Sequence, residues 1–375
     1  MRIGLLTYGL DRAPTGIGRY AIELLHAMAA QASDHDLVLL STEQTDRHRL
    51  WERFEHHALK GCQKLPLLMT YGNLLLKQAA ERYKLDLIHD PNSIAPFIGL
   101  PSTTKRIVTI HDAFSYIYPQ TQSRLDTWRY RYMLPGVLRK TNAVITNSQQ
   151  SHQDIAQYLN VPGANMHIIP YGMHPRFAPV PAAVAANEVC QKYGITQPYL
   201  LYVGGINARK NIVRLFEAFA QVHERHPELK LVIGGARQWR FKEIDAAFER
   251  LGLDDSVHFT GYLNNEDLPM LYSGAAAFVF PSLYEGFGIP PLEAMACGTP
   301  VVTSNVSSLP EVVGDAALTV DPYDVGALAA AIERALTDTA LRAELRARGL
   351  ARAAQFTWER AARETIAVYE RVLAG

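Results

Sequence analysis

Residues Pro281–Asn305, PSLYEGFGIPPLEAMACGTPVVTSN, combine a loop, a short helix and the start of a strand. The apolar run Ala275–Phe280 before them is short enough for a buried parallel strand. A loop with Glu285 follows, and Pro290-Pro291 suits the first turn of a helix, where an amide proton would lack a partner. Because Gly298 ends that helix before the next strand, we expect an open loop and a helix N-terminus at the carboxyl edge of a sheet. Anionic ligands bind at such edges.

Two carboxylates lie in this stretch. Glu285 is in the glycine-containing loop, where a ligand can approach the backbone closely, and Glu293 is expected in the first helical turn, facing the same opening. Taken alone, Glu293 could simply complement the helix dipole, and Glu285 could be a solvated loop charge. Their spacing, with EGFG and two prolines between them, favours a functional pair.

Composition limits the class of protein. The chain has 375 residues, enough for two domains with separate cores. Lys plus Arg and Asp plus Glu number 37 each, so no global charge attracts nucleic acid. The three cysteines, Cys62, Cys190 and Cys297, fit neither a disulfide framework nor a metal site, which indicates a reducing compartment. No apolar run is long enough to span a membrane, and MRIGLLTYG predicts a strand, so we expect a cytoplasmic protein.

Short apolar runs alternate with helix-period segments, which predicts an α/β protein with doubly wound parallel sheets. Helices are expected at Gly18–Ala30, Arg124–Arg139 (kinked at Pro135) and Ser151–Leu159. The proline-rich passage His174–Asn187 predicts a domain boundary. The predicted strands are Ile3–Thr7, Leu37–Ser41, Leu87–His89, Ile107–Ile110, Ala143–Thr146, His167–Ile169, Tyr199–Val203, Leu229–Ile233, Val257–Thr260, Ala275–Phe280, Pro300–Thr303 and Leu318–Val320.

Glycines and cations follow one of these strands. Gly204 and Gly205 come directly after Tyr199–Val203, and Arg209 and Lys210 follow. Backbone amides can hold a diphosphate and the cations can neutralise it. The alternative is a solvated loop with two surface cations.

A second glycine motif occurs near the start of the chain. Gly16–Ala21 matches G-x-G-x-x-A, so a nicotinamide dinucleotide site has to be considered. A true fingerprint follows its strand immediately, whereas Tyr8–Thr15 intervene here. The other interpretation is a flexible loop that caps a helix.

A histidine ends another predicted strand. His111 follows Arg106–Ile110 and would lie at the edge of a cleft, although a lone histidine is more often structural. Asn147-Ser148 follows Ala143–Thr146 in the same way, and helix capping is as good an explanation there as ligand contact.

The stretch Pro281–Asn305 resembles the E-x7-E signature of the retaining glycosyltransferases of family four, in the GT-B superfamily. VTIHDAFSYIYP around His111 and IIPYGMHPRF before the proline-rich passage are similar to family segments too. The resemblance implies two Rossmann-like domains that face one another across a cleft. The first is an acceptor-side domain at residues 1–178, joined by a final helix at 357–375. The second is a nucleotide-sugar-binding domain at 179–356.

The resemblance implies transfer of a hexosyl group from a nucleotide-diphosphate sugar to a hydroxyl of a glycan or lipid-linked glycan, with retention and without a cofactor. The segment's appearance favours a mannosyl group from GDP-mannose and polysaccharide assembly. Asp34-His35-Asp36 precedes a strand instead of ending one, so we expect no metal-bridged diphosphate. A GT-B protein that binds a sugar nucleotide without transferring it, such as an epimerase, is one alternative; an NAD(P)-dependent oxidoreductase is the other.

The resemblance also implies roles for particular residues. Glu285 and His111 would contact the donor sugar, and Arg209 and Lys210 the departing diphosphate. Family members commonly carry an arginine where Gly205 stands, so it is open which cation contacts which phosphate. Glu293 would bind the ribose diol, and the backbone at Tyr262 and Leu263 the base. The implied donor-binding residues are Gly16, Gly18, Gly204, Gly205, Gly234, Tyr262, Leu263, Gly286, Phe287, Gly288, Ile289, Leu292 and Glu293.

Two segments have the composition of a membrane interface. Arg124–Lys140 mixes cations with aromatic residues, and Leu65–Leu76 is apolar but too short to span a bilayer. Peripheral contact with the cytoplasmic face of the inner membrane and ordinary packing of both segments stay open.

Overall fold

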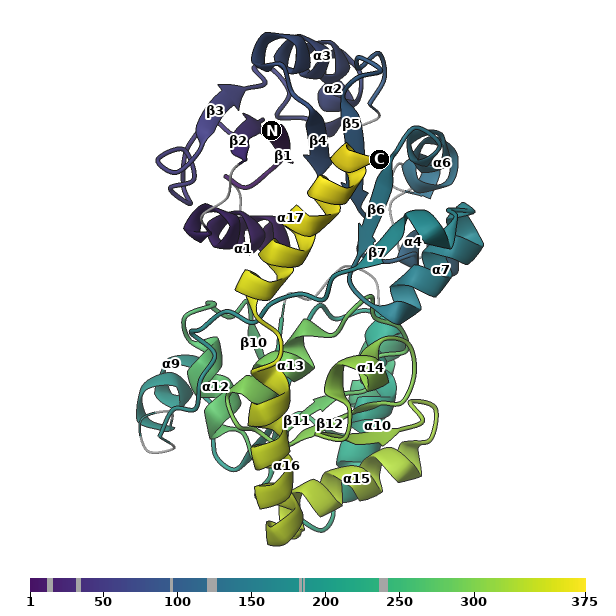
Figure 1. Cartoon of the computed structure of the whole chain (residues 1–375). Coiled ribbons are helices and arrows are strands. Elements are labelled where there is room, and N and C mark those ends of the chain that lie inside the picture. The colour runs from purple at the N-terminus through teal and green to yellow at the C-terminus, as the bar shows by residue number, and fades with distance from the viewer. Residues whose placement is uncertain are drawn as a thin grey trace. The chain divides into compact units, whose positions relative to one another are not determined.

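The chain forms two compact units. One comprises Met1–Gly172 and Thr357–Gly375, and the other Met173–Phe356. Each is built on one parallel sheet with helices packed against it (Figure 1), which confirms the predicted α/β class. The computed structural model describes residues 1–11, 16–31, 35–94, 97–119, 127–181, 184, 186–235 and 242–375.

The N-terminal unit has a parallel sheet in the order β3-β2-β1-β4-β5-β6-β7, so the direction of winding reverses between β1 and β4. Its strands are β1 Arg2–Thr7, β2 Asp36–Ser41, β3 Glu55–Ala58, β4 Leu87–Asp90, β5 Lys105–Thr109, β6 Ala143–Thr146 and β7 Met166–Ile168. Its helices are α1 Gly16–Ala30, α2 Leu65–Met69, α3 Tyr71–Tyr83, α4 Phe114–Ile117, η2 Arg129–Met133, α6 Leu134–Leu138, α7 Gln149–Leu159, η3 Gly163–Asn165 and α17 Trp358–Ala374.

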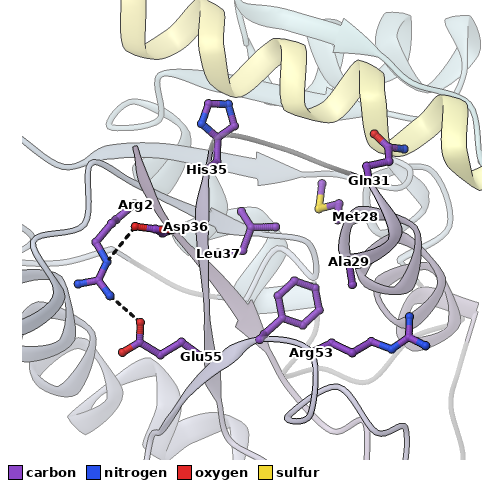
Figure 2. Close-up of a pocket in the computed structure, with 10 residues that line it drawn as sticks. Arg2, Met28, Ala29, Gln31, His35, Asp36, Leu37, Arg53 and Glu55 are labelled. Atoms are coloured by element: carbon purple, nitrogen blue, oxygen red, sulfur yellow. Dashed lines mark hydrogen bonds and ion pairs between the residues drawn. The ribbon is translucent and has the colours of Figure 1, made fainter.

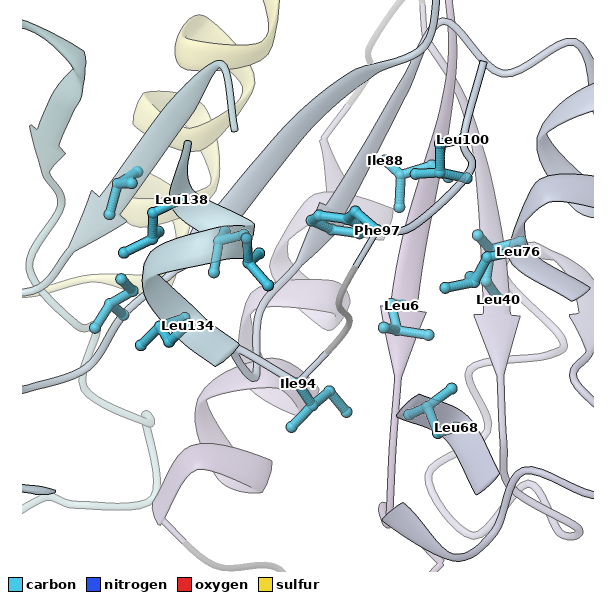
Figure 3. Close-up of a cluster of buried hydrophobic side chains, with 14 of the residues drawn as sticks. Leu6, Leu40, Leu68, Leu76, Ile88, Ile94, Phe97, Leu100, Leu134 and Leu138 are labelled. Carbon is cyan, nitrogen blue, oxygen red and sulfur yellow. The ribbon is translucent and has the colours of Figure 1, made fainter. Parts of the chain in front are cut away.

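Apolar side chains of strands and helices form one buried cluster in this unit. Because side chains alternate along a strand, Leu6 of β1 and Leu40 of β2 lie on one face with Leu68 of α2 and Leu134 of α6 (Figure 3). Two other helices of the N-terminal unit, α1 and α17, pack against each other, although they are far apart in sequence (Figure 1). The final helix is thus part of the N-terminal unit.

The described part of the predicted helix Arg124–Arg139 is not a continuous α-helix. Residues 120–126 lie outside the described part of the chain. Arg129–Met133 form a π-helical turn, η2, before α6 begins at Leu134 with Pro135 in its first turn. Proline donates no amide hydrogen and its ring crowds the carbonyl one turn earlier, so the preceding turn widens. The expected disturbance at Pro135 therefore takes the form of a π turn.

The C-terminal unit repeats the topology. Its parallel sheet has the order β10-β9-β8-β11-β12-β13, and its winding reverses between β8 and β11. The strands are β8 Tyr199–Val203, β9 Lys230–Gly234, β10 Val257–Gly261, β11 Ala277–Phe280, β12 Val301–Ser304 and β13 Leu318–Val320. The helices are η4 Ala186–Cys190, α9 Gln191–Tyr193, η5 Ala208–Lys210, α10 Ile212–His223, α11 Lys242–Arg250, α12 Leu268–Gly274, α13 Ile289–Ala296, α14 Leu309–Val313, α15 Val325–Thr337 and α16 Thr339–Ala353.

Helix starts late in the chain follow ordinary capping chemistry. The side chains of Asp324, Asp338 and Thr357 accept hydrogen bonds from the backbone amides three residues later, at the starts of α15, α16 and α17. None of the described helices is long and apolar enough to cross a membrane.

Candidate active site

Two loops meet at the point where the winding of the C-terminal sheet reverses. One follows β8 and contains η5, and the other follows β11 and leads into α13. The Leu283 amide donates to the Arg209 carbonyl at 2.8 Å, and Asn211 Nδ2 donates to the Pro281 carbonyl at 3.1 Å. In open α/β sheets, ligands bind beyond the carboxyl ends of the strands at such a point.

Three predicted residues come together here, although they lie far apart in sequence. Lys210 Nζ is 2.5 Å from Glu285 Oε1, and Arg209 Nη1 is 3.0 Å from Glu285 Oε2. Their side chains are only 9%, 17% and 12% exposed for Lys210, Arg209 and Glu285. Lys210 Nζ also lies 4.5 Å from the centre of the Phe280 ring. The interpretation of Arg209 and Lys210 as two solvated surface cations is therefore wrong, and so is that of Glu285 as a solvated loop charge.

Glu285 is held in its ionised form. Burial by itself raises the pKa of this carboxyl, but the charges of Arg209 and Lys210 and the hydrogen bond from Lys210 outweigh burial and lower the pKa to about 2. The cluster thus contains two cations and one anion at neutral pH, with an excess of positive charge. That excess suits a ligand carrying several negative charges.

Two serines hold the loop that carries Glu285. Ser307 Oγ accepts from the Glu285 amide at 3.1 Å and donates to the Glu285 carbonyl at 2.6 Å. Ser308 Oγ lies 2.9 Å from the Glu285 carbonyl oxygen and 2.6 Å from that of Phe287. We did not predict these residues. Their position just beyond the predicted strand Pro300–Thr303, at the same edge of the sheet, could have indicated them.

Glycines let the strand ends approach one another. The Gly204 amide donates to the Gly234 carbonyl at 2.9 Å. A Cβ on Gly235, which has φ +150°, would lie 2.0 Å from the Gly204 carbonyl oxygen. At the start of α13, Gly288 has φ +119° and a Cβ there would meet Leu309 at 2.9 Å. A side chain is thus excluded at these two positions.

Glu293 is placed differently from our prediction. Helix α13 begins at Ile289, one residue earlier than expected, so Glu293 lies in the second turn and no acidic residue occupies the first. Its side chain is buried, and Glu293 Oε2 accepts from the Tyr272 hydroxyl at 2.9 Å. A simple role as complement to the helix dipole does not fit this position, and a ribose contact stays a prediction.

The remaining predicted donor-binding residues of this unit differ in exposure. The side chains of Leu263, Phe287 and Leu292 are buried, so a ligand could reach these positions only through the backbone. Tyr262 is 63% exposed. Residues 205, 286 and 289 lie in or beside the two loops and are partly exposed.

In the N-terminal unit, His111 follows β5 at the carboxyl edge of the sheet and is 8% exposed. Its Nε2 lies 2.8 Å from the Pro91 carbonyl oxygen, and its Nδ1 is bonded to the Tyr171 hydroxyl. Burial lowers the pKa of His111 to about 4, against the opposing effect of the Pro91 bond, so the ring is neutral at pH 7. Asn147 Nδ2 donates to the His111 carbonyl at 2.8 Å, whereas Ser148 is the N-cap of α7.

The glycine motif near the N-terminus is helical. Gly16 and Gly18 lie in the first turn of α1, and residues 12–15 are outside the described part of the chain. A dinucleotide fingerprint needs its first glycine in a tight turn directly after the strand, which this position does not provide. Glu43, which we did not predict, fixes the segment after β1 by accepting from the Leu10 amide at 3.1 Å.

A charged cavity lies at the opposite edge of the N-terminal sheet (Figure 2). Its volume is about 390 Å³, and its lining includes Arg2, Asp36 and Glu55 at the amino ends of strands. Arg2 pairs there with Glu55 at 2.5 Å and with Asp36 at 3.9 Å. Because Asp36 and Glu55 both pair with Arg2 and the cavity lies away from the carboxyl edge, we do not assign it to the active site.

The described residues contain no group of three or more His, Cys, Asp or Glu side chains arranged to hold a metal ion. The three cysteines, Cys62, Cys190 and Cys297, are buried and have free thiols.

Comparison with known proteins agrees with this geometry. Residues 14–177 match the model for Glycosyltransferase Family 4, and residues 188–352 match that for Glycosyl transferases group 1. The O-antigen chain mannosyltransferase B of Escherichia coli is 35% identical over 99% of this chain and 100% of that protein. The serotype-specific mannosyltransferase WbdA of Escherichia coli is 32% identical over 72% of this chain and 34% of that longer protein.

Solved structures agree as well. The sucrose-phosphate synthase of Thermosynechococcus elongatus superposes with a TM-score of 0.79 and 26% identity, over 100% of this chain and 99% of that one. The two family models thus match successive parts of one chain, and that chain has the expected fold. The protein belongs to the group 1 glycosyltransferases of the GT-B superfamily.

Proposed function

We propose that this glycosyltransferase moves a mannosyl group from GDP-mannose to a hydroxyl of a glycan or lipid-linked glycan, with retention of configuration and without a metal ion. The observation that carries the proposal is the buried cluster of Arg209, Lys210 and Glu285 at the reversal point of the C-terminal sheet. It supplies positive charge where a nucleoside diphosphate would bind.

The two cations would act on the leaving group. As the glycosidic bond breaks, negative charge grows on the departing diphosphate, and an interaction with that charge is stronger in the transition state than in the ground state. Glu285 already holds Arg209 and Lys210 in place, so little reorganisation accompanies the reaction.

Glu285 can serve the donor sugar at the same time. Oε1 accepts a hydrogen bond from Lys210 and Oε2 forms an ion pair with Arg209, whereas an ionised carboxylate has about four lone-pair sites. The remaining sites can accept sugar hydroxyls. Retention without a covalent intermediate would let a donor phosphate oxygen receive the acceptor proton.

Glu293 would bind the ribose diol after exchanging its bond with Tyr272. A matched pair of variants separates this role from packing. Tyr272→Phe removes the same hydrogen bond but leaves the carboxylate, so it should preserve GDP affinity. Glu293→Gln should weaken GDP binding, because the amide has no negative charge and only one accepting oxygen where the carboxylate has two. Equal effects of the two variants would assign Glu293 a packing role only.

The choice of mannose and of a polysaccharide product rests on relatives. The two Escherichia coli proteins named above are mannosyltransferases, one of the O-antigen chain. Calorimetric titration with GDP, UDP and ADP tests the base: GDP should bind best, and a clear preference for another nucleotide would overturn the donor assignment. A protein that only binds the sugar nucleotide would release no GDP when an acceptor is added.

A peripheral membrane contact is part of the proposal. Leu67, Tyr71 and Leu74 recur at helical spacing along α2 and α3 and are 45%, 51% and 50% exposed. Trp128 and Tyr132 are 50% and 66% exposed. Exposed apolar and aromatic groups of this kind insert at bilayer interfaces.

Liposomes test this contact. The protein should sediment with anionic liposomes at low salt and less so at high salt. The double variant Trp128→Ser/Tyr132→Ser should reduce sedimentation while GDP affinity is unchanged. No sedimentation at low salt would favour an acceptor that is free in solution.

A further inference from the structure

The imidazole of His111 is bonded at both ring nitrogens, and its partners define where its protons lie. Nε2 lies 2.8 Å from the Pro91 carbonyl oxygen, which can only accept. Nε2 therefore carries a hydrogen. Because burial keeps the ring neutral at pH 7, Nδ1 is left as an acceptor.

The group that faces Nδ1 is the hydroxyl of Tyr171, which consequently donates its proton to His111. Burial raises the pKa of Tyr171 well above its usual value, so the hydroxyl keeps that proton throughout the physiological range. Tyr171 follows β7 and precedes Gly172, the last residue before the chain enters the C-terminal unit.

Asn147 supports this arrangement from the other side. Its Nδ2 is 2.8 Å from the His111 carbonyl oxygen and 2.8 Å from the Tyr171 hydroxyl oxygen. A carbonyl accepts only, so the amide NH₂ must face it, and the same NH₂ donates to the Tyr171 oxygen. Ser151 Oγ adds a bond to the His111 carbonyl at 3.2 Å. The ring and the main chain of His111 are thus both fixed.

The Tyr171 ring is itself enclosed. Its centre lies 5.0 Å from that of Tyr20 on α1 and 6.2 Å from that of Trp358 on α17. Tyr20 also meets the His111 ring edge to face at 4.9 Å. Aromatic rings from two helices therefore hold Tyr171 in the orientation in which its hydroxyl reaches Nδ1.

We propose that Tyr171 is a positioning residue that, with the Pro91 carbonyl, locks His111 as a neutral hydrogen-bond donor through Nε2–H. The inference rests on the proposed function and on the contact between His111 and the donor sugar that the family resemblance implies. His111 would then donate to a sugar oxygen when Nε2–H exchanges Pro91 for substrate. It would not accept a proton, because Nδ1 is already occupied.

Nitrogen NMR of the full-length protein labelled with ¹⁵N-histidine tests the proposal without any substrate. His111→Gln identifies the His111 signals. At pH 7 we expect a protonated Nε2 and an unprotonated, hydrogen-bonded Nδ1. In Tyr171→Phe, the Nδ1 signal should move to the position of a free, unbonded ring nitrogen.

Tyr199→Phe is the matched control. Tyr199 is a fully buried tyrosine of the C-terminal unit whose hydroxyl donates to the Leu271 carbonyl at 2.7 Å, so its loss should leave the His111 signals in place. A proton on Nδ1 in the wild type, or an unchanged Nδ1 signal in Tyr171→Phe, would overturn the proposal. If Tyr171→Phe does not fold, the wild type alone still tests the proposal, because a proton on Nδ1 of His111 would overturn it.

Kinetics separate this inference from the proposed function. Tyr171→Phe should lower kcat/KM for the donor about three- to tenfold, as expected for one lost hydrogen bond acting through His111. If His111→Gln leaves turnover unchanged, His111 does not contact the donor sugar in the way proposed. The NMR experiment tests the bond between Tyr171 and His111 independently of that result.

Discussion

Replacing Glu285 by glutamine should destabilise the C-terminal unit by about 3 kcal/mol at pH 7. The structure sets this magnitude. Burial and the two neighbouring cations together move the pKa of Glu285 from its ordinary value of 4.5 to about 2. At about 1.4 kcal/mol per pH unit, that difference is the extra stability which the ionised carboxylate gives the folded state. Glutamine keeps the shape but leaves Arg209 and Lys210 without a counter-charge.

The effect has a defined pH dependence. Since the folded-state pKa lies below the unfolded one, the stabilisation is complete above about pH 5 and is lost as the pH falls towards about 2. Glutamine does not titrate. The difference between the wild type and Glu285→Gln should therefore shrink by about 2 kcal/mol between pH 7 and about pH 3.

Urea unfolding followed by far-UV circular dichroism measures this difference. Glu344→Gln is a suitable control, because Glu344 forms an exposed ion pair with Arg348 at 2.5 Å in the same unit and is 48% exposed. Its loss should cost no more than about 0.5 kcal/mol. If Glu285→Gln is no more destabilising than this control at pH 7, or if its effect does not change with pH, the buried-cluster argument is wrong.

Three further predictions concern packing, binding and turnover. Gly172→Ala should destabilise the N-terminal unit by about 1–3 kcal/mol in urea unfolding, because its Cβ would lie 2.2 Å from the backbone nitrogen of Trp358; an unchanged midpoint would contradict this. Glu293→Ala should weaken GDP binding by about 1.5–3 kcal/mol in calorimetric titration, and unchanged affinity would remove Glu293 from the donor site. The double variant Arg209→Ala/Lys210→Ala should lower kcat about a hundredfold or more at saturating acceptor; a change in KM alone would mean that the pair only anchors the donor.

Much of the fold could be predicted because buried parallel strands are short apolar runs. All the predicted strands occur, with ends that differ by at most two residues. Strand β3, Glu55–Ala58, escaped prediction because EHHA contains no apolar run. The apolar segment Leu65–Leu76 became parts of two helices, α2 and α3, since a short apolar run does not distinguish a buried helix from other structures.

Side-chain contacts in the candidate site are harder to predict from the sequence than the strands are. Proximity of Glu285 to the cationic loop follows from topology, because both come after neighbouring strands of a parallel sheet. Direct pairing of Glu285 with Lys210 depends on side-chain rotamers, which periodicity does not report. The same holds for Ser307 and Ser308, and for the bond between Tyr171 and His111, which joins residues on different strand ends.

The central claim is retaining mannosyl transfer, and the anomeric configuration of the first product tests it most directly. The wild type should be incubated with GDP-α-mannose and a mannose-containing acceptor, and the new anomeric signals followed by NMR before any equilibration. We predict an α-linked product that appears together with free GDP, and only when the acceptor is present. A β-linked product would contradict retention, and GDP-mannose that stays intact in the presence of acceptor, while UDP- or ADP-sugars are consumed, would contradict the donor.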